Sequence, residues 1–182
     1  MALNATISKV ELHIADMDRH YYQQHNLTLA QHPSETAERL MLRLLVFAMH
    51  ASEFLVFTKG LSTEDEPDLW QKSLTGDIEL WIELGLPSDK RIRKACGRAQ
   101  QVFVYTYGRG TAEMWWKTNQ PLLTRFDNLT VIHIPQEISK QLAQFAERNL
   151  QVQINIQDGE VTWHCNGESV CFTPQPLMST KS

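Results

Sequence analysis

The pattern of apolar and polar positions divides the first part of this chain into two strands and a helix. Apolar residues alternate with polar ones over residues 4–15 and 22–30, which predicts two half-buried strands. From Ser34 to Ser52, leucine, methionine and alanine recur at helical spacing. Ser34 is the predicted N-cap, because its hydroxyl can accept a hydrogen bond from the first turn.

The rest of the chain predicts alternating strands and helices that end in a β-meander. The elements are a strand at 54–58, an acidic connection with one helical turn at 61–74, a strand at 77–85, a helix at 87–100, a strand at 102–107, a helix containing Trp115 and Trp116, a strand at 129–134, a helix at 136–148, and strands at 152–156, 161–165 and 170–173. Asp158-Gly159 and Asn166-Gly167 are strong hairpin signals between the last three strands. The order predicts one mixed α/β (α+β) domain over residues 1–182, with an N-terminal hairpin and a C-terminal meander.

The strand predicted at 77–85 has an unusual polar face. Its apolar face alternates with a face that carries Trp81 and three carboxylates, Asp77, Glu79 and Glu83. Carboxylates are poor strand formers, and three on one face repel one another. The pattern therefore predicts a cation above them, either a divalent metal or basic side chains. A solvated strand face, or neutralisation by Arg39, Arg43 or Arg91, explains the same pattern without a metal.

Composition and charge narrow the class of protein. The net charge of −4 gives no overall attraction to nucleic acid or to an anionic membrane, so nucleic-acid binding would need a local basic patch. No apolar run approaches the ~20 residues that span a bilayer, and the first residues lack the pattern of a secretory signal. The three cysteines have no metal-type spacing. These features predict a cytoplasmic protein that does not contact membranes.

Six short motifs follow one another along nearly the whole chain. They are His-Pro-Ser-Glu-Thr at 32–36, Glu-Arg-Leu-Met-Leu-Arg-Leu-Leu at 38–45, Asp-Glu-Pro at 65–67, Leu-Trp-Ile-Glu-Leu-Gly-Leu-Pro at 80–87, Arg-Ile-Arg-Lys-Ala-Cys at 91–96 and Ile-Gln-Asp-Gly at 156–159. In this order they resemble the YaeQ family of bacterial proteins. The resemblance implies a compact fold that varies the PD-(D/E)XK core of restriction-endonuclease-like enzymes, in a family whose biochemical role is poorly defined.

The resemblance also implies a catalytic arrangement. In PD-(D/E)XK nucleases, carboxylates on neighbouring strands hold Mg²⁺ or Mn²⁺, and a lysine two residues after the last carboxylate orients the attacking water. Glu83 corresponds to the motif glutamate, and Glu79 lies one strand repeat before it. Glu38 or Glu35 corresponds to the carboxylate from the first helix. Gly85 occupies the lysine position, which is a departure from the motif.

Basic residues of the helix at 87–100 are the candidates to replace that lysine. Arg91, Arg93 and Lys94 are predicted to contact phosphate, with Arg93 and Lys94 in the catalytic set. Arginine is not a base at neutral pH but can bind a phosphate through two hydrogen bonds. Lys59 is another candidate, and a solvated basic helix face is the simpler explanation of the cluster.

Ordinary structural roles also account for several of the acids. Helix N-terminal electrostatics explain Glu35 and Glu38, and Glu35 forms an i,i+4 pair with Arg39. Pro67-Asp68 is a literal Pro-Asp at a spacing from Glu83 that the nuclease motif tolerates. A turn or helix cap explains it equally well.

Three functions follow from these residues. The first is a metal-dependent nuclease or phosphodiesterase, with Asp77, Glu79 and Glu83 holding the metal. The second is a non-catalytic module that binds nucleic acid or a protein. The third is a regulatory protein of the transcription machinery, which predicts an exposed apolar patch near Trp115 or Trp116. A basic nitrogen within reach of Glu83 would favour catalysis, and arginine–carboxylate pairs that fill the site would favour the module.

Overall fold

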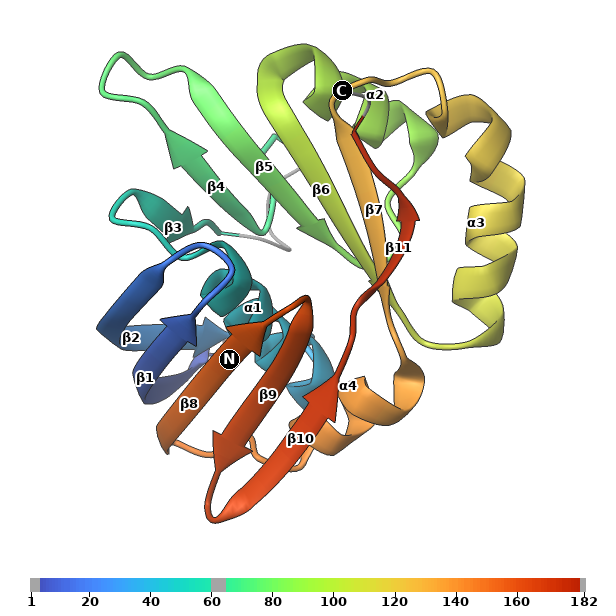
Figure 1. Cartoon of the computed structure of the whole chain (residues 1–182). Helices are drawn as coiled ribbons and strands as arrows, with labels where there is room; N and C mark the ends of the chain where they lie inside the picture. The colour runs from blue at the N-terminus through green and yellow to red at the C-terminus, as the bar shows by residue number, and fades with distance from the viewer. Residues whose placement is uncertain (1–3, 60–64, 181–182) are drawn as a thin grey trace. The chain divides into compact units, whose positions relative to one another are not determined.

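The computed structural model describes residues 4–59 and 65–180. Contacts within the chain divide it into two units, each with its own sheet (Figure 1). The described part of the first unit covers residues 4–50 and 137–174. The second unit covers residues 51–59, 65–136 and 175–180. The single domain over residues 1–182 therefore stays a prediction.

The first unit contains a five-stranded sheet in the order β10-β9-β8-β1-β2. Its strands are β1 (Thr6–Asp16), β2 (Tyr21–Gln31), β8 (Asn149–Gln157), β9 (Glu160–Cys165) and β10 (Glu168–Phe172). Strands β1 and β2 form the predicted hairpin, β1 pairs in parallel with β8, and β8 to β10 form the predicted meander. Asp158 and Asn166 adopt positive φ, as the Asp-Gly and Asn-Gly turns require.

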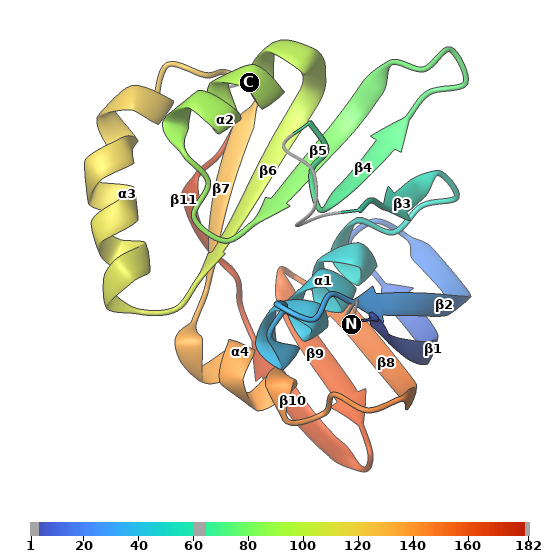
Figure 2. The same cartoon turned by 180° about the vertical axis from the view of Figure 1, so that it is seen from behind.

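Two helices, α1 (Ala37–His50) and α4 (Gln136–Ala143), cover one face of this sheet (Figures 1 and 2). Helix α1 is buried from Leu40 to Ala48. The Phe47 ring packs edge-on against the His25 ring, with ring centres 5.3 Å apart. The Arg39 amide donates to the Thr36 hydroxyl at 3.1 Å, so the predicted cap at Ser34 is wrong and Thr36 begins the helix.

The second unit contains a six-stranded sheet in the order β11-β7-β6-β5-β4-β3. Its elements are β3 (Leu55–Phe57), β4 (Leu69–Lys72), β5 (Ile78–Leu84), α2 (Asp89–Arg98), β6 (Ala99–Tyr107), α3 (Gly110–Leu123), β7 (Leu129–Ile134) and β11 (Gln175–Met178). Strands β5, β6 and β7 are parallel, and β3, β4 and β11 join antiparallel. Both helices lie on one face (Figure 2), where Trp81, Ile92 and Leu123 belong to one buried cluster.

Three predictions about the extent of strands and helices are wrong. Strand β4 forms where residues 61–74 predict an acidic connection, of which residues 61–64 lie outside the described residues. Leu69 is fully buried in β4, and Trp70 packs edge-on against Trp81 with ring centres 6.2 Å apart. Asp77 precedes β5 rather than opening it, and α4 ends at Ala143 rather than near residue 148.

None of the helices in the described ranges is both long and apolar enough to cross a membrane.

Candidate functional site

Two buried carboxylates lie where the pairing of β4 with β5 ends. Leu69 pairs with Ile82 in the antiparallel register, and Asp68 and Glu83 are the residues just beyond this pair. The Asp68 amide donates to the Ile82 carbonyl oxygen at 3.0 Å, which departs from the register by one residue. Asp68 and Glu83 are only 3% and 5% exposed. We call these two residues the carboxylate pair.

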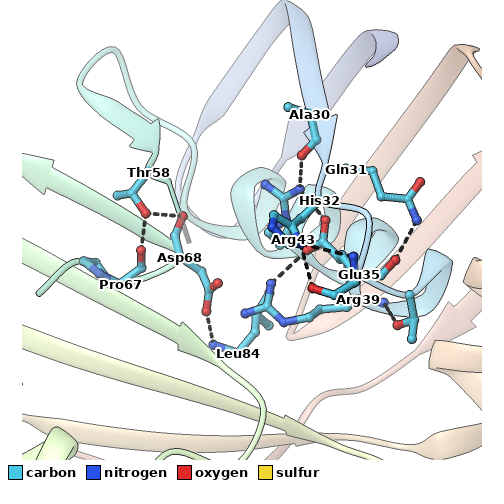
Figure 3. A network of polar contacts seen from close by, with 12 residues as sticks. Ala30, Gln31, His32, Glu35, Arg39, Arg43, Thr58, Pro67, Asp68 and Leu84 are labelled. Atoms are coloured by element: carbon cyan, nitrogen blue, oxygen red, sulfur yellow. Dashed lines mark hydrogen bonds and ion pairs between the residues drawn. The ribbon is translucent and has the colours of Figure 1, made fainter. Parts of the chain in front are cut away.

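Asp68 is anchored by backbone contacts on both strands. Its Oδ2 accepts the Leu84 amide at 2.7 Å, and Thr58 donates to the carbonyl oxygens of Pro67 and Asp68 (Figure 3). Asp68 directly precedes β4, and its carboxylate satisfies a backbone donor of β5 at this point.

Glu83 contacts one basic residue and one aromatic residue through the same oxygen. Its Oε1 accepts from Trp81 Nε1 at 2.9 Å and from Arg91 Nε at 2.8 Å. Among residues 4–59 and 65–180, no hydrogen bond to Oε2 of Glu83 is found. The Arg91 guanidinium also donates to the Glu66 carbonyl oxygen at 2.7 Å, so it joins Glu83 to the segment before Asp68.

Helix α2 holds Arg91 in this position. Ser88 caps the helix by accepting the Arg91 amide, and Ile92 and Ala95 fix its inner face in the core. Arg91 lies in the first turn, beside this buried stripe, so its side chain reaches β5. Arg91 is one of the arginines predicted as a neutralising partner of the strand carboxylates, and it pairs with Glu83.

The remaining basic residues of α2 make other contacts. Lys94 pairs with Asp65 at 2.7 Å, where both side chains are exposed. Arg98 donates to the Asp65 carbonyl oxygen, and its guanidinium lies 5.3 Å from the centre of the Trp81 ring. Arg93 is exposed. A hollow of about 440 Å³ is lined by Ser88, Lys90, Arg91 and Lys94.

The surroundings of Glu83 change its acidity. Burial is the largest effect, and the Asp68 carboxylate adds to it; together they raise the pKa of Glu83 from 4.5 to about 7. The Arg91 charge and the hydrogen bonds from Trp81 and Arg91 act in the opposite direction and are outweighed. A buried acid whose pKa is shifted by burial and by a nearby charge, as here by Asp68, is a typical feature of functional sites.

The carboxylates predicted on the strand face do not form one group. Asp77 is exposed in the turn before β5, where its carboxylate accepts from Thr75 at 2.8 Å. Glu79 accepts from Gln71 at 2.7 Å. Within the described part of the chain, no three His, Cys, Asp or Glu side chains are grouped so as to hold a metal. The set of Asp77, Glu79 and Glu83 is therefore not assembled, and metal binding at Glu83 stays a prediction.

The helix acids lie in the first unit. Both oxygens of Glu35 are bound, because Arg43 donates to Oε1 and Oε2 at 2.7 and 2.9 Å and Arg39 donates to Oε2 at 2.8 Å (Figure 3). Arg43 also donates to the Ala30 carbonyl oxygen. Glu38 lies in the first turn of α1, half-buried. Glu35 therefore has a structural role, as its pairing with Arg39 predicts.

Gly85, at the motif lysine position, has a backbone reason to be glycine. It ends β5 with φ of +106°, and its amide donates to the Tyr105 carbonyl oxygen at 2.9 Å. L-residues rarely adopt this φ, so a lysine here would strain the turn. The partner of Glu83 that the strand pattern misses is Asp68, and its signal in the sequence is the Pro67-Asp68 dipeptide.

The tryptophans of α3 are not exposed as a patch. Trp115 donates its indole N–H to the Pro87 carbonyl oxygen at 2.8 Å, and Trp115 and Trp116 both pack against the buried cluster. The larger apolar exposures on this helix are Met114 and Leu122.

Comparison with known proteins identifies relatives over most of the chain. Residues 1–174 match the family model described as "YaeQ protein". "Uncharacterized protein YaeQ" of Escherichia coli K12 is 47% identical over 163 residues, which is 90% of each chain. The crystal structure of YaeQ protein from Xanthomonas axonopodis pv. citri is 47% identical, with a TM-score of 0.93 over 96% of this chain and 99% of that one. YaeQ protein from Pseudomonas syringae is 32% identical, with a TM-score of 0.92 over 96% and 97%.

Proposed function

The chain belongs to the YaeQ family, and on that premise we propose that its second unit is a metal-dependent phosphodiester hydrolase of the nuclease type. The observation that supports the proposal is the carboxylate pair: Asp68 and Glu83 are both buried, and Asp68 accepts the amide of Leu84, the residue that follows Glu83. Two like charges in this position destabilise each other, as the raised pKa of Glu83 reflects. A divalent cation between them would relieve that repulsion.

The residues of the pair fit such a cation. Mg²⁺ binds oxygen ligands and is usually held by one or two carboxylates, with water and substrate phosphate completing its shell. Oε2 of Glu83 accepts no hydrogen bond from the described residues, so one ligand atom needs no rearrangement. When bound, Mg²⁺ or Mn²⁺ would polarise the scissile phosphate and make the attacking water more acidic. In this assignment Asp68 takes the place that the strand pattern gives to Asp77.

The other residues of this proposal bind or orient the substrate. Arg91 lies beside Glu83 and lines the basic hollow, so its guanidinium is suited to hold a phosphate of the substrate. Arg93 and Lys94 remain predicted phosphate contacts. Pro67-Asp68 and Glu83 then correspond to the acidic positions of a PD-(D/E)XK core, and Gly85 to the position of its lysine.

The ion pair between Arg91 and Glu83 favours a second candidate. In this alternative Arg91 permanently neutralises Glu83, no metal binds, and the unit is a non-catalytic module that binds nucleic acid or a protein. The basic side chains of α2 would then serve binding alone. The two candidates differ in whether the carboxylates act on a substrate or only stabilise the fold.

A hydrolysis assay separates them. The protein is incubated with duplex DNA, single-stranded DNA, RNA and bis(p-nitrophenyl) phosphate, in Mg²⁺, in Mn²⁺ and in EDTA. We expect metal-dependent cleavage that Asp68→Asn and Glu83→Gln each reduce on the order of a hundredfold or more. Glu53→Gln is the matched control, because Glu53 is an exposed acid of the same unit.

Four results would count against the proposal. Cleavage insensitive to EDTA would exclude the metal, and equal activity of all variants would point to a contaminant. An equal loss in Glu79→Gln but not in Asp68→Asn would favour the set predicted from the strand pattern. Absence of cleavage together with nucleic-acid binding that depends on Arg91 would favour the non-catalytic module.

A further inference from the structure

The sheet of the first unit ends in an unusually long edge strand. Strand β2 runs for 11 residues, from Tyr21 to Gln31, and is the last strand of its sheet. Its register with β1 continues without a bulge along the whole length. A regular edge of this length presents a row of unpaired backbone donors and acceptors to other strands.

The direction of the backbone groups along β2 follows from two contacts. The Lys9 amide donates to the Arg148 carbonyl oxygen, away from β2, so its cross-strand partner Thr28 also turns its N–H and C=O away from β1. The Ala30 carbonyl oxygen points outward as well, because it accepts from Arg43 at 2.8 Å (Figure 3). Since direction alternates along a strand, the outward groups belong to residues 22, 24, 26, 28 and 30.

Most of this edge is uncovered in the described part of the chain. Tyr22, Gln24, Asn26 and Thr28 are exposed, and no contact beyond the side-chain bond from Lys9 to Thr28 is found for these four outside the β1 ladder. Arg43 closes the edge only at Ala30. The available edge therefore extends from Tyr22 to Thr28.

The other sheet edges carry the protective features that β2 lacks. Strand β3 has three residues, and β11 has four residues with Pro176 and a register irregularity. Strand β10 has five residues and begins at Glu168. Short length, proline, irregularity and charge all disfavour pairing with another strand. Strand β2 contains no Asp, Glu, Lys, Arg or Pro.

From this contrast we propose that β2 pairs antiparallel with β2 of a second copy of this chain, about a two-fold axis at Asn26. Antiparallel pairing of identical strands is the isologous contact that closes a dimer. The axis brings the outward backbone groups of Asn26 opposite those of its counterpart, and those of Gln24 opposite those of Thr28. Each of these pairs can exchange two backbone hydrogen bonds. The five-stranded sheets of the two copies then form one continuous sheet.

The side chains of β2 suit a second copy. Because the strand carries no formal charge, two-fold pairing opposes no like charges. The opposed pairs are Asn26 with Asn26, Gln24 with Thr28, and Tyr22 with Ala30, which place amide, hydroxyl and apolar groups together. An extended peptide from a different protein could use the same edge, and the test separates that outcome from the dimer.

Sedimentation equilibrium of the full chain across micromolar concentrations tests the proposal. We expect wild type to dimerise and Asn26→Pro to raise the dissociation constant of the dimer on the order of thirtyfold. Proline has no backbone N–H, so the substitution removes the two donors of residue 26 at the two-fold axis. The Asn26 amide points away from β1, so the hairpin itself keeps its ladder, which circular dichroism checks. Asn26→Lys places two ammonium groups opposite each other and should also weaken the dimer. Gln151→Lys makes the same change of charge on β8, inside the sheet, and should leave the dimer intact.

Cysteine trapping gives a positive readout. In a Cys171→Ser background, which removes the exposed native thiol, Asn26→Cys places two thiols opposite each other within disulfide range. We expect mild oxidation to yield a covalent dimer with Asn26→Cys and none with Gln151→Cys. A wild type that is monomeric throughout, a dimer insensitive to both Asn26 variants, or equal trapping at both positions would overturn the proposal.

Discussion

Glu35 and Glu83 are both buried glutamates beside arginines, but their carboxylates have different surroundings. Both oxygens of Glu35 are bound by Arg39 and Arg43, whose side chains are 12% and 8% exposed. The hydrogen bonds that Glu83 receives from the described residues both end on one oxygen, and another carboxylate, Asp68, lies near it. Glu35 is compensated by cations, whereas Glu83 is only partly compensated.

The difference shows how to tell a structural acid from a candidate functional one. A buried carboxylate with every lone pair satisfied by cations stabilises the fold only in its charged form. A carboxylate with a raised pKa, an unbound oxygen and a like-charged neighbour can take up a proton or a cation without breaking existing contacts. Residue type and burial are the same at both sites, so the neighbours decide the role.

The largest expected effect is the loss of stability when Glu35 is neutralised. Glu35→Gln leaves the buried Arg43 without a counter-charge, so we expect the free energy of unfolding to fall by about 3 to 5 kcal/mol in urea titrations. Glu38→Gln is the matched control on the first turn of α1 and should change the free energy of unfolding by less than about 0.5 kcal/mol. Similar losses for the two variants would contradict the structural role of Glu35.

The next effect is a dependence of stability on pH that arises from Glu83. Its pKa is about 7 in the folded protein and 4.5 ordinarily, so the folded state binds the proton more tightly than the unfolded chain. The contribution of Glu83 to the free energy of unfolding is complete at a pH below its pKa in the unfolded chain. This contribution is lost as pH rises through about 7, and the loss is about 3 kcal/mol at most.

Urea titrations from about pH 5 to about pH 8 measure this loss. Glu83→Gln cannot titrate, so its stability should fall less than that of wild type over the same range. Parallel curves for the two proteins would show that Glu83 has no raised pKa.

A smaller effect isolates the contribution of Asp68. Asp68→Asn removes the like charge but keeps an oxygen that can accept the Leu84 amide, so the pKa of Glu83 should fall toward its ordinary value. Carboxyl ¹³C NMR titration of Glu83 measures this directly. Asp65→Asn is the control, because Asp65 is exposed and pairs with Lys94. An unchanged titration in Asp68→Asn would mean that burial alone sets the pKa.

Periodicity was sufficient to predict the elements with strong local signals. The N-terminal hairpin, the apolar run of α1 and the two turns with Asp158 and Asn166 are confirmed, because each pattern is determined by neighbours in the sequence. Strand β4 was missed since it has four residues, of which only Leu69 is buried. Its pairing with β5 and β3 defines it, and a single sequence carries little information on such pairing.

The same limitation applies to the candidate site. The strand pattern identified Glu83, and Arg91 was among the arginines predicted to neutralise it. Neither could indicate that Asp68 lies near Glu83, because the contacts of Asp68 with the end of β5 are tertiary. Asp77 was grouped with Glu83 because the strand was predicted to begin one residue too early.

Titration calorimetry with Mn²⁺ at about pH 8, where Glu83 is ionised, tests the central claim most directly. The account predicts saturable binding by wild type and by Glu53→Gln, and loss of that binding in both Asp68→Asn and Glu83→Gln with the fold intact by circular dichroism. No saturable binding by wild type at millimolar Mn²⁺, or binding that survives both substitutions, would contradict a metal site at the carboxylate pair.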